Sequence, residues 1–213
     1  MPKDLAIVLN DGSIASAVAT SLAVQRYRPV LLHGEAVPQG ASRVRAAYDQ
    51  QVAHFKPYRE HSIATPWTMA LAQPAPGDVR MAGPVQQRLM ALSPLIAIAA
   101  RFAAYYDAAA IYIGLRIGPD ADDLTVATEY LQIWNELLQL PCGQPELEIH
   151  APLLELEMWQ VVDLAFQVHA PLELTWSCLG ETAEPCGNCR GCRTRDQAFQ
   201  QAGKPDPLRT VRR

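Results

Sequence analysis

Four of the five cysteines gather near the C-terminal end of the chain, at Cys178, Cys186, Cys189 and Cys192. Two interlocking Cys-x-x-Cys turns, with a fourth cysteine one loop upstream, can place four thiolates at the corners of a tetrahedron, the geometry of structural zinc sites. Four protein ligands leave no open position for water, so such a metal would stabilise the fold and would not catalyse a reaction. A redox Cys-x-x-Cys pair accounts for only two of the four, and an iron–sulfur cluster is the remaining alternative. The pattern therefore predicts structural zinc.

The segments that must position these cysteines alternate between strand-like and helix-like patterns. Apolar runs predict buried strands at 5–9, 29–33 and 110–114, and an edge strand at 147–150. Apolar residues at helical spacing predict helices at 14–24, 44–56, 85–106, 125–138 and 156–168. This alternation predicts an α/β fold, a parallel sheet with helices on both faces. We expect this fold in residues 1–170, with a zinc-binding segment packed on it in residues 171–213.

Prolines mark the interruptions of this pattern. Residues 65–84 hold four prolines and two glycines, which makes this segment long for a simple connection and a candidate lid. Pro94 lies inside the expected helix at 85–106 and should kink it or mark its true start. Residues 116–124 are polar and rich in aspartate, so a loop is expected there.

The composition excludes several classes of protein. With 213 residues, of which 49% are hydrophobic and 19% charged, the chain is a globular protein and neither disordered nor a coiled coil. The formal charge of −4 argues against a general nucleic-acid binder. Arg101 and Asp107 interrupt the most apolar stretch, residues 89–115, so no membrane span is expected. The apolar residues near the N-terminus are too few for a signal peptide, and we expect a cytoplasmic protein.

The C-terminal segment resembles the zinc-binding end of a known family, the 7-cyano-7-deazaguanine synthases. The shared pattern is Thr-Trp-Ser-Cys at 175–178, Pro-Cys-Gly-x-Cys-x-x-Cys at 185–192, and then an arginine, Ala-Phe, Ala-Gly and Asp-Pro up to Pro207. The segment Ile111-Tyr112-Ile113-Gly114 and the order of strands and helices also match. The likeness is strong from about residue 170 to 207 and weaker elsewhere.

This resemblance implies a fold, a reaction and partners. The family has an ATP-pyrophosphatase fold, which is adenine nucleotide alpha hydrolase-like, and makes the deazapurine precursor of queuosine in transfer RNA. Its members adenylate the carboxylate of 7-carboxy-7-deazaguanine, ammonia displaces AMP, and the amide is activated again and dehydrated to the nitrile. The resemblance therefore implies zinc, ATP and magnesium as cofactors, a small deazapurine or nucleotide as ligand, and a homodimer.

The family's nucleotide loop, Ser-Gly-Gly-x-Asp-Ser after the first strand, is altered in this chain. Of the six matching residues, which begin at Asp11 and end at Ser16, only Gly12 and Ser16 agree. Asp11 brings a negative charge to the place of the triphosphate, and two unit charges about 4 Å apart repel by roughly 4 kcal/mol at an effective dielectric constant of about 20. Ser13 replaces a glycine and Ala15 the aspartate. The candidate cofactor-binding residues are Asp11, Gly12, Ser13 and Ser16.

Other positions also depart from the family pattern. Met158 stands where the family has a lysine, Arg116 where it has an asparagine, and Arg88 lies near its Pro-x-Arg-Asn segment. Three hypotheses follow from these changes, and no catalytic residue is assigned. The favoured one is a family member impaired in adenylation that acts as a binding or partner protein. The others are an active ligase with relocated ATP contacts, and a different hydrolase or transferase that reuses the pocket.

Overall fold

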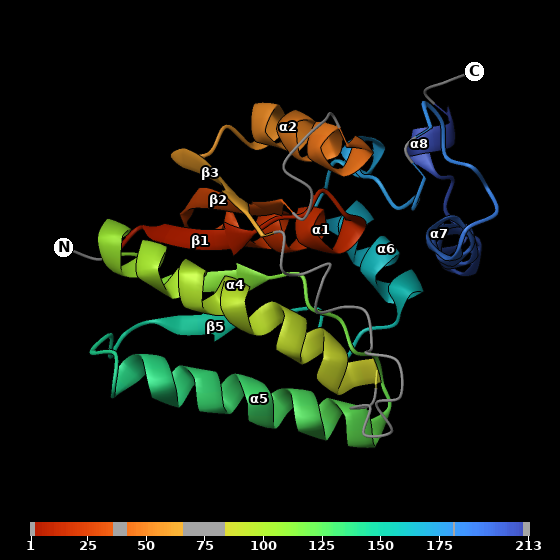
Figure 1. Cartoon of the computed structure of the whole chain (residues 1–213). Coiled ribbons are helices and arrows are strands. Elements are labelled where there is room, and N and C mark those ends of the chain that lie inside the picture. Colours follow the sequence, from red (N-terminus) through yellow and green to blue (C-terminus); the bar gives the residue numbers. More distant parts are fainter. Residues whose placement is uncertain (1–2, 36–41, 66–83, 181, 211–213) are drawn as a thin grey trace.

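The central feature of the molecule is a parallel sheet (Figure 1). The computed structural model describes residues 3–35, 42–65, 84–180 and 182–210, so the candidate lid at 66–83 lies outside the described residues. Five strands pair in the order β3-β2-β1-β4-β5, all parallel, which confirms the expected α/β fold. Their bounds are β1 Leu5–Leu9, β2 Arg28–Glu35, β3 Arg59–Ala64, β4 Ala110–Ile113 and β5 Glu148–His150.

Helices cover both faces of this sheet, as the sequence predicts. Their bounds are α1 Ile14–Ala23, α2 Arg43–Phe55, α4 Pro84–Tyr106, α5 Ala121–Gln139, α6 Met158–Gln167, α7 Arg190–Ala202 and α8 Pro207–Thr210, with a 3₁₀ turn η1 at Leu172–Leu174. Leu5 and Ile7 of β1 face the core formed with α4 and α5, while Ala6 and Val8 face the core formed with α1 and α2. This alternation follows from the period of two along a strand. α6 packs between α1 and α7.

Several elements differ from the sequence-based expectation, and among them α7, α8 and η1 in the C-terminal segment were not predicted. β3 was not predicted, because it is a largely exposed edge strand and no apolar run marks it. α5 begins at Ala121, within the stretch that was expected to be a loop. The side chain of Asp120 accepts a hydrogen bond from the Asp123 amide at 3.0 Å and so caps the helix. Acidic residues in the first turn are further favoured by the helix dipole.

The longest helix, α4, contains Pro94, which neither begins nor ends it. By length and composition alone, Val85–Tyr106 could cross a membrane, with a mean hydropathy of 1.5. In the fold, Leu89, Ile96 and Ala99 are buried on its inner side, in the cores that this helix shares with the sheet and with α5. Packing in the fold buries 28% of this apolar window.

Candidate functional site

A cavity opens at the carboxyl ends of the central strands. Its volume is about 360 Å³, and its walls come from the first loop and from β2, β4 and α4. β2 and β3 lie on one side of β1, and β4 and β5 lie on its other side. The cavity therefore lies at the point where the order of the strands reverses. Open parallel sheets bind ligands at such switch points. The lining includes Asp11, Ser13, Ser16, Arg88, Leu92 and Ile113.

Asn10 shapes the loop between β1 and α1 from a fully buried position. Its amide nitrogen donates to the Thr20 hydroxyl at 3.1 Å and to the Gln51 side-chain oxygen at 2.9 Å. Its side-chain oxygen accepts from the Gly12 amide at 2.8 Å. No sequence motif had assigned Asn10 a part in this site. An asparagine whose side-chain oxygen accepts a hydrogen bond from the backbone amide two residues later is typical of tight turns. An asparagine followed by Asp11-Gly12 was therefore the sequence signal that could have identified this residue.

Asp11, Ser13 and Ser16 form the part of the loop that faces the cavity. The Asp11 carboxylate accepts a hydrogen bond from the Ser13 amide at 3.0 Å. The Ser13 hydroxyl accepts from the Ser16 amide at 3.2 Å and caps α1. Two amides at the start of this helix are thus bonded to side chains of the loop itself. Gly12 has a φ of +78°, and a Cβ there would lie 2.8 Å from the carbonyl oxygen of Val44.

Arg88 and Arg116 lie close to each other, and of the two only Arg88 lines the cavity. Arg88 on α4 lines the cavity and donates a hydrogen bond to the backbone carbonyl of Arg116, which follows β4. The Arg116 guanidinium lies 3.5 Å from the carbonyl oxygen of Leu156. The pKa of Arg88 is lowered, first by loss of surrounding water and then by repulsion from Arg116 and Arg190. The lining of the cavity therefore holds one positive side chain, Arg88, and one negative side chain, Asp11.

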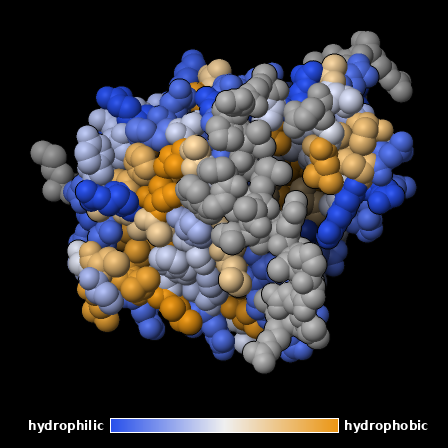
Figure 2. Space-filling model, in the orientation of Figure 1, coloured by the Kyte–Doolittle hydropathy of each residue, from blue (hydrophilic) through white to orange (hydrophobic). Residues whose placement is uncertain are grey.

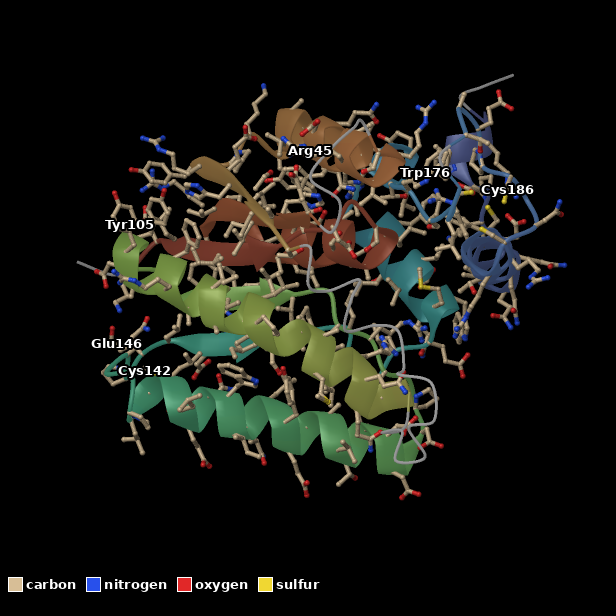
Figure 3. All side chains as sticks on the ribbon, in the orientation of Figure 1. Arg45, Tyr105, Cys142, Glu146, Trp176 and Cys186 are labelled. Carbon is tan, nitrogen blue, oxygen red and sulfur yellow. The ribbon has the colours of Figure 1, made fainter. Side chains whose placement is uncertain are left out.

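The structure brings the four predicted cysteines together beside α7. Their sulfur atoms all lie within 4.8 Å of one another, and Figure 3 shows the Cys186 side chain in this group. The sulfurs of Cys186 and Cys192 are 4.0 Å apart, and those of Cys178 and Cys189 are 3.9 Å apart. A tetrahedron with Zn–S bonds of about 2.3 Å has sulfurs about 3.8 Å apart. The group fits a metal such as zinc.

Backbone amides favour the thiolate form of two of these cysteines. The amides of Leu179 and Cys192 each donate to the Cys189 sulfur at 3.4 Å and lower its pKa to about 6. The amides of Asn188 and Cys189 lower the pKa of Cys186. Burial raises the pKa of Cys192 to about 12. Because metals bind the thiolate, a bound cation would favour deprotonation of all four.

Residues 174–176 connect the cysteine group to the cavity loop. The Trp176 amide donates to the carbonyl of Gly12 at 2.9 Å, two residues before the first cysteine. Gln51 bridges the same two segments, because its oxygen accepts from Asn10 and its nitrogen donates to the carbonyl of Leu174 at 3.2 Å. These hydrogen bonds therefore tie the segment before the cysteines to the loop at the cavity.

Comparison with known protein families agrees with the cysteine pattern of the sequence and with the arrangement of these cysteines in the structure. A family model described as "Queuosine biosynthesis protein QueC" matches residues 85–203, which include Arg88 and the four cysteines but not the loop at 11–16. The chain belongs to the QueC family. Curated relatives of this QueC family protein include two named 7-cyano-7-deazaguanine synthase. That of Aliarcobacter butzleri is 38% identical over 116 residues, 54% of this chain and 50% of that one. That of Koribacter versatilis is 26% identical over 217 residues, 95% and 92% of the two chains.

Solved structures share the fold of this QueC family protein. A 4-thiouridine synthetase in complex with RNA and bound ATP has a TM-score of 0.57 and 16% identity, over 94% of this chain and 50% of that one. The NMN synthetase of Francisella tularensis has a TM-score of 0.50 and 16% identity, over 96% and 79% of the two chains. These likenesses confirm the ATP-pyrophosphatase-type, adenine nucleotide alpha hydrolase-like fold.

Proposed function

We propose that this QueC family protein binds a small deazapurine or nucleotide in its cavity and is impaired in the ATP-dependent conversion of 7-carboxy-7-deazaguanine to the nitrile. The observation that carries the proposal is the bond between the Asp11 carboxylate and the Ser13 amide. A phosphate bound at this helix N-terminus would need the same amides that the loop's own side chains already engage. The chain would then act as a binding or partner protein.

The charges of the loop support this proposal. Asp11 adds a negative charge next to the place where the resemblance puts a triphosphate, and Ala15 supplies no carboxylate that could help to hold magnesium. Met158, at the start of α6, has no charge with which to offset a phosphate. These changes disfavour ATP and leave a cavity with polar ends and an apolar wall, a composition suited to a small ligand.

In this proposal the cysteine segment has a structural role. Zinc held by Cys178, Cys186, Cys189 and Cys192 would supply binding energy that fixes residues 178–192, since a site closed by four protein ligands has no position for a substrate. In this proposal residues 1–170 form the ligand-binding α/β domain, and residues 171–213 form the zinc-binding segment packed on it.

The proposal is tested by measuring AMP and pyrophosphate release from ATP and magnesium, with 7-carboxy-7-deazaguanine and ammonia present. The matched positive control is the Koribacter versatilis relative, assayed under the same conditions. We expect substrate-dependent AMP from the control and none above background from this protein, in a folded sample of measured zinc content. Calorimetry should nevertheless detect binding of the deazapurine. Substrate-dependent AMP from this protein would instead establish an active ligase with relocated ATP contacts.

A further inference from the structure

A chain of side-chain amides runs from the cavity loop to the segment that precedes the cysteines. Gln51 on α2 is fully buried, and its nitrogen donates a hydrogen bond to the backbone carbonyl of Leu174 at 3.2 Å. Its oxygen accepts a hydrogen bond from the Asn10 side-chain nitrogen at 2.9 Å. The Asn10 oxygen in turn accepts from the backbone amide of Gly12 at 2.8 Å. Two buried side chains therefore connect the backbone of Leu174 to the backbone of Gly12.

The direction of this chain of hydrogen bonds is fixed at both ends. The carbonyl of Leu174 can only accept a hydrogen bond, and the backbone amide of Gly12 can only donate one. The two side-chain amides between them must therefore point their nitrogens toward Leu174 and their oxygens toward Gly12. A half turn of either amide would place donor against donor and acceptor against acceptor, and would leave buried groups unpaired. Only one arrangement of the two amides forms all of these bonds.

The other backbone group of Gly12 is bonded to the same segment. The Trp176 amide donates to the Gly12 carbonyl at 2.9 Å. Residues 174–176 therefore hold both backbone polar groups of Gly12, the carbonyl directly and the amide through the two side chains. Asp11 and Ser13, the neighbours of Gly12, line the cavity. The position of this part of the cavity wall thus depends on the segment before the cysteines.

That segment also contacts the residues of the cysteine group. Arg195 on α7 donates to the Thr175 hydroxyl at 2.8 Å. Cys189 is the N-cap of α7, and Cys192 lies in its first turn. Trp176 packs in one buried cluster with Cys192. The segment before the cysteines therefore contacts the metal-binding residues on one side and the cavity loop on the other.

We propose that Gln51 is a positioning residue that couples the cysteine group to the cavity loop, so that zinc binding and the ordered loop stabilise each other. Ordering a buried glutamine side chain costs rotamer entropy comparable to the net gain from one hydrogen bond, so both of its bonds are needed to hold it. The bond to Asn10 is therefore favoured only while Leu174 is in place. Zinc on the four cysteines would keep it there. This inference does not depend on which ligand the cavity holds.

The test measures hydrogen exchange at the Gly12 amide, together with zinc affinity, in the full chain. In the wild type, removal of zinc by a chelator should speed exchange at Gly12 by about tenfold or more, the equivalent of one lost hydrogen bond. In Gln51→Met this exchange should already be fast with zinc bound, and zinc removal should have little further effect. The same variant should bind zinc more weakly in competition with a chromogenic chelator, because coupling between two sites is reciprocal.

Two references separate this effect from a general loss of stability. The Ile111 amide lies in β4, which is paired on both sides, and its exchange should stay slow when zinc is removed. Gln50→Met is the matched control, since Gln50 is the preceding residue of the same helix and is exposed. It should change neither the exchange at Gly12 nor the zinc affinity.

A second variant, Gln51→Asn, keeps a buried amide that is one methylene shorter and can reach only one of the two partners. It should fold, exchange faster than the wild type at Gly12, and show a smaller effect of zinc. Thermal unfolding of each variant reports whether the fold is retained.

Three results would overturn the proposal. The first is a wild type in which zinc removal leaves exchange at Gly12 unchanged, or speeds it no more than at Ile111. The second is a folded Gln51→Met variant with the zinc dependence of the wild type. The third is loss of the fold in both Gln51 variants, because Gln51 would then support the whole domain and not this connection. No ligand enters these measurements, so each of these failures leaves the proposed function standing.

Discussion

At the scale of single residues, Asp11 is the most consequential departure from the nucleotide loop of the related synthases. Its carboxylate lies at the start of α1, where the helix dipole favours a negative charge. The carboxylate also accepts a hydrogen bond from the Ser13 amide. The substitution therefore stabilises the loop while it disfavours a polyanion. Asn10, one residue earlier, fixes the course of the same loop through its buried amide group.

We predict that Asp11→Asn raises the affinity for magnesium-ATP by about tenfold or more. The amide oxygen can still accept from Ser13, while the charge is lost. Solvent reduces the full repulsion of roughly 4 kcal/mol to about 1–2 kcal/mol for this exposed side chain. Calorimetry with ATP and magnesium measures the change. Asp122→Asn is the control, since Asp122 is an exposed acidic residue on α5. Equal ATP affinity in Asp11→Asn and the wild type would show that charge is not the obstacle.

At the scale of elements, α7 and the C-terminal residues are held by a buried ion pair. Two nitrogens of the Arg195 guanidinium contact the two carboxylate oxygens of Asp206 at 2.7 and 2.8 Å, and both side chains are more than nine-tenths buried. Arg195 also donates to the Thr175 hydroxyl at 2.8 Å. The ion pair holds α7 to the C-terminal residues, and the bond to Thr175 joins α7 to the segment that precedes the cysteines.

We predict that Arg195→Met lowers the free energy of unfolding by about 3–5 kcal/mol, because it removes the guanidinium that offsets the charge of the buried Asp206 carboxylate. Denaturant unfolding followed by circular dichroism measures the loss. Arg193→Met, an exposed position on the same helix, should change stability by no more than about 0.5 kcal/mol. A similarly small effect at Arg195 would mean that the pair contributes little to the fold.

The connection between the cysteine group and the cavity loop leads to a second prediction at this scale. Purified protein should contain close to one zinc per chain, and a strong chelator should speed hydrogen exchange at the Trp176 amide, whose acceptor is Gly12. Cys189→Ser should have the same effect. Cys142→Ser, a free exposed cysteine outside the group, should not. Metal-free protein with unchanged exchange at Trp176 would contradict a structural metal.

At the scale of the whole molecule, the outer surface of α4 and α5 carries exposed apolar side chains. Tyr105 is 75% exposed, Ile133 64% and Leu140 81%, and Figure 2 shows apolar residues gathered over these helices. Figure 3 places Tyr105 at the end of α4. Exposed apolar patches are found at protein interfaces.

The resemblance implies a homodimer, and we predict that this face forms its interface. Light scattering should give the mass of a dimer for the wild type and of a monomer for the double variant Ile133→Glu, Leu140→Glu, because the buried carboxylates would be unpaired. Val24→Glu, an exposed apolar position at the end of α1, is the control and should stay dimeric. A monomeric wild type would reject the homodimer, and a dimeric double variant would place the interface elsewhere.

Much of the architecture could be predicted because its signals are local. The runs that become β1, β2 and β4 are apolar along their length, since strands buried on both faces need no polar side. The spacing of the four cysteines within one short segment predicted the metal site. β3 and the first turn of α5 were missed because an exposed edge strand and a capped helix start have no apolar pattern of their own.

The sequence by itself therefore determined the α/β class, the family and the cysteine group, all of which depend on neighbours in the chain. Only the tertiary structure decided that Arg88 and Asp11 line one cavity, that Arg88 bonds the carbonyl of Arg116, and that the Trp176 amide bonds the cavity loop. These contacts join residues that lie far apart in the sequence. They depend on how helices and strands pack, and periodicity reports only which side of each element is buried.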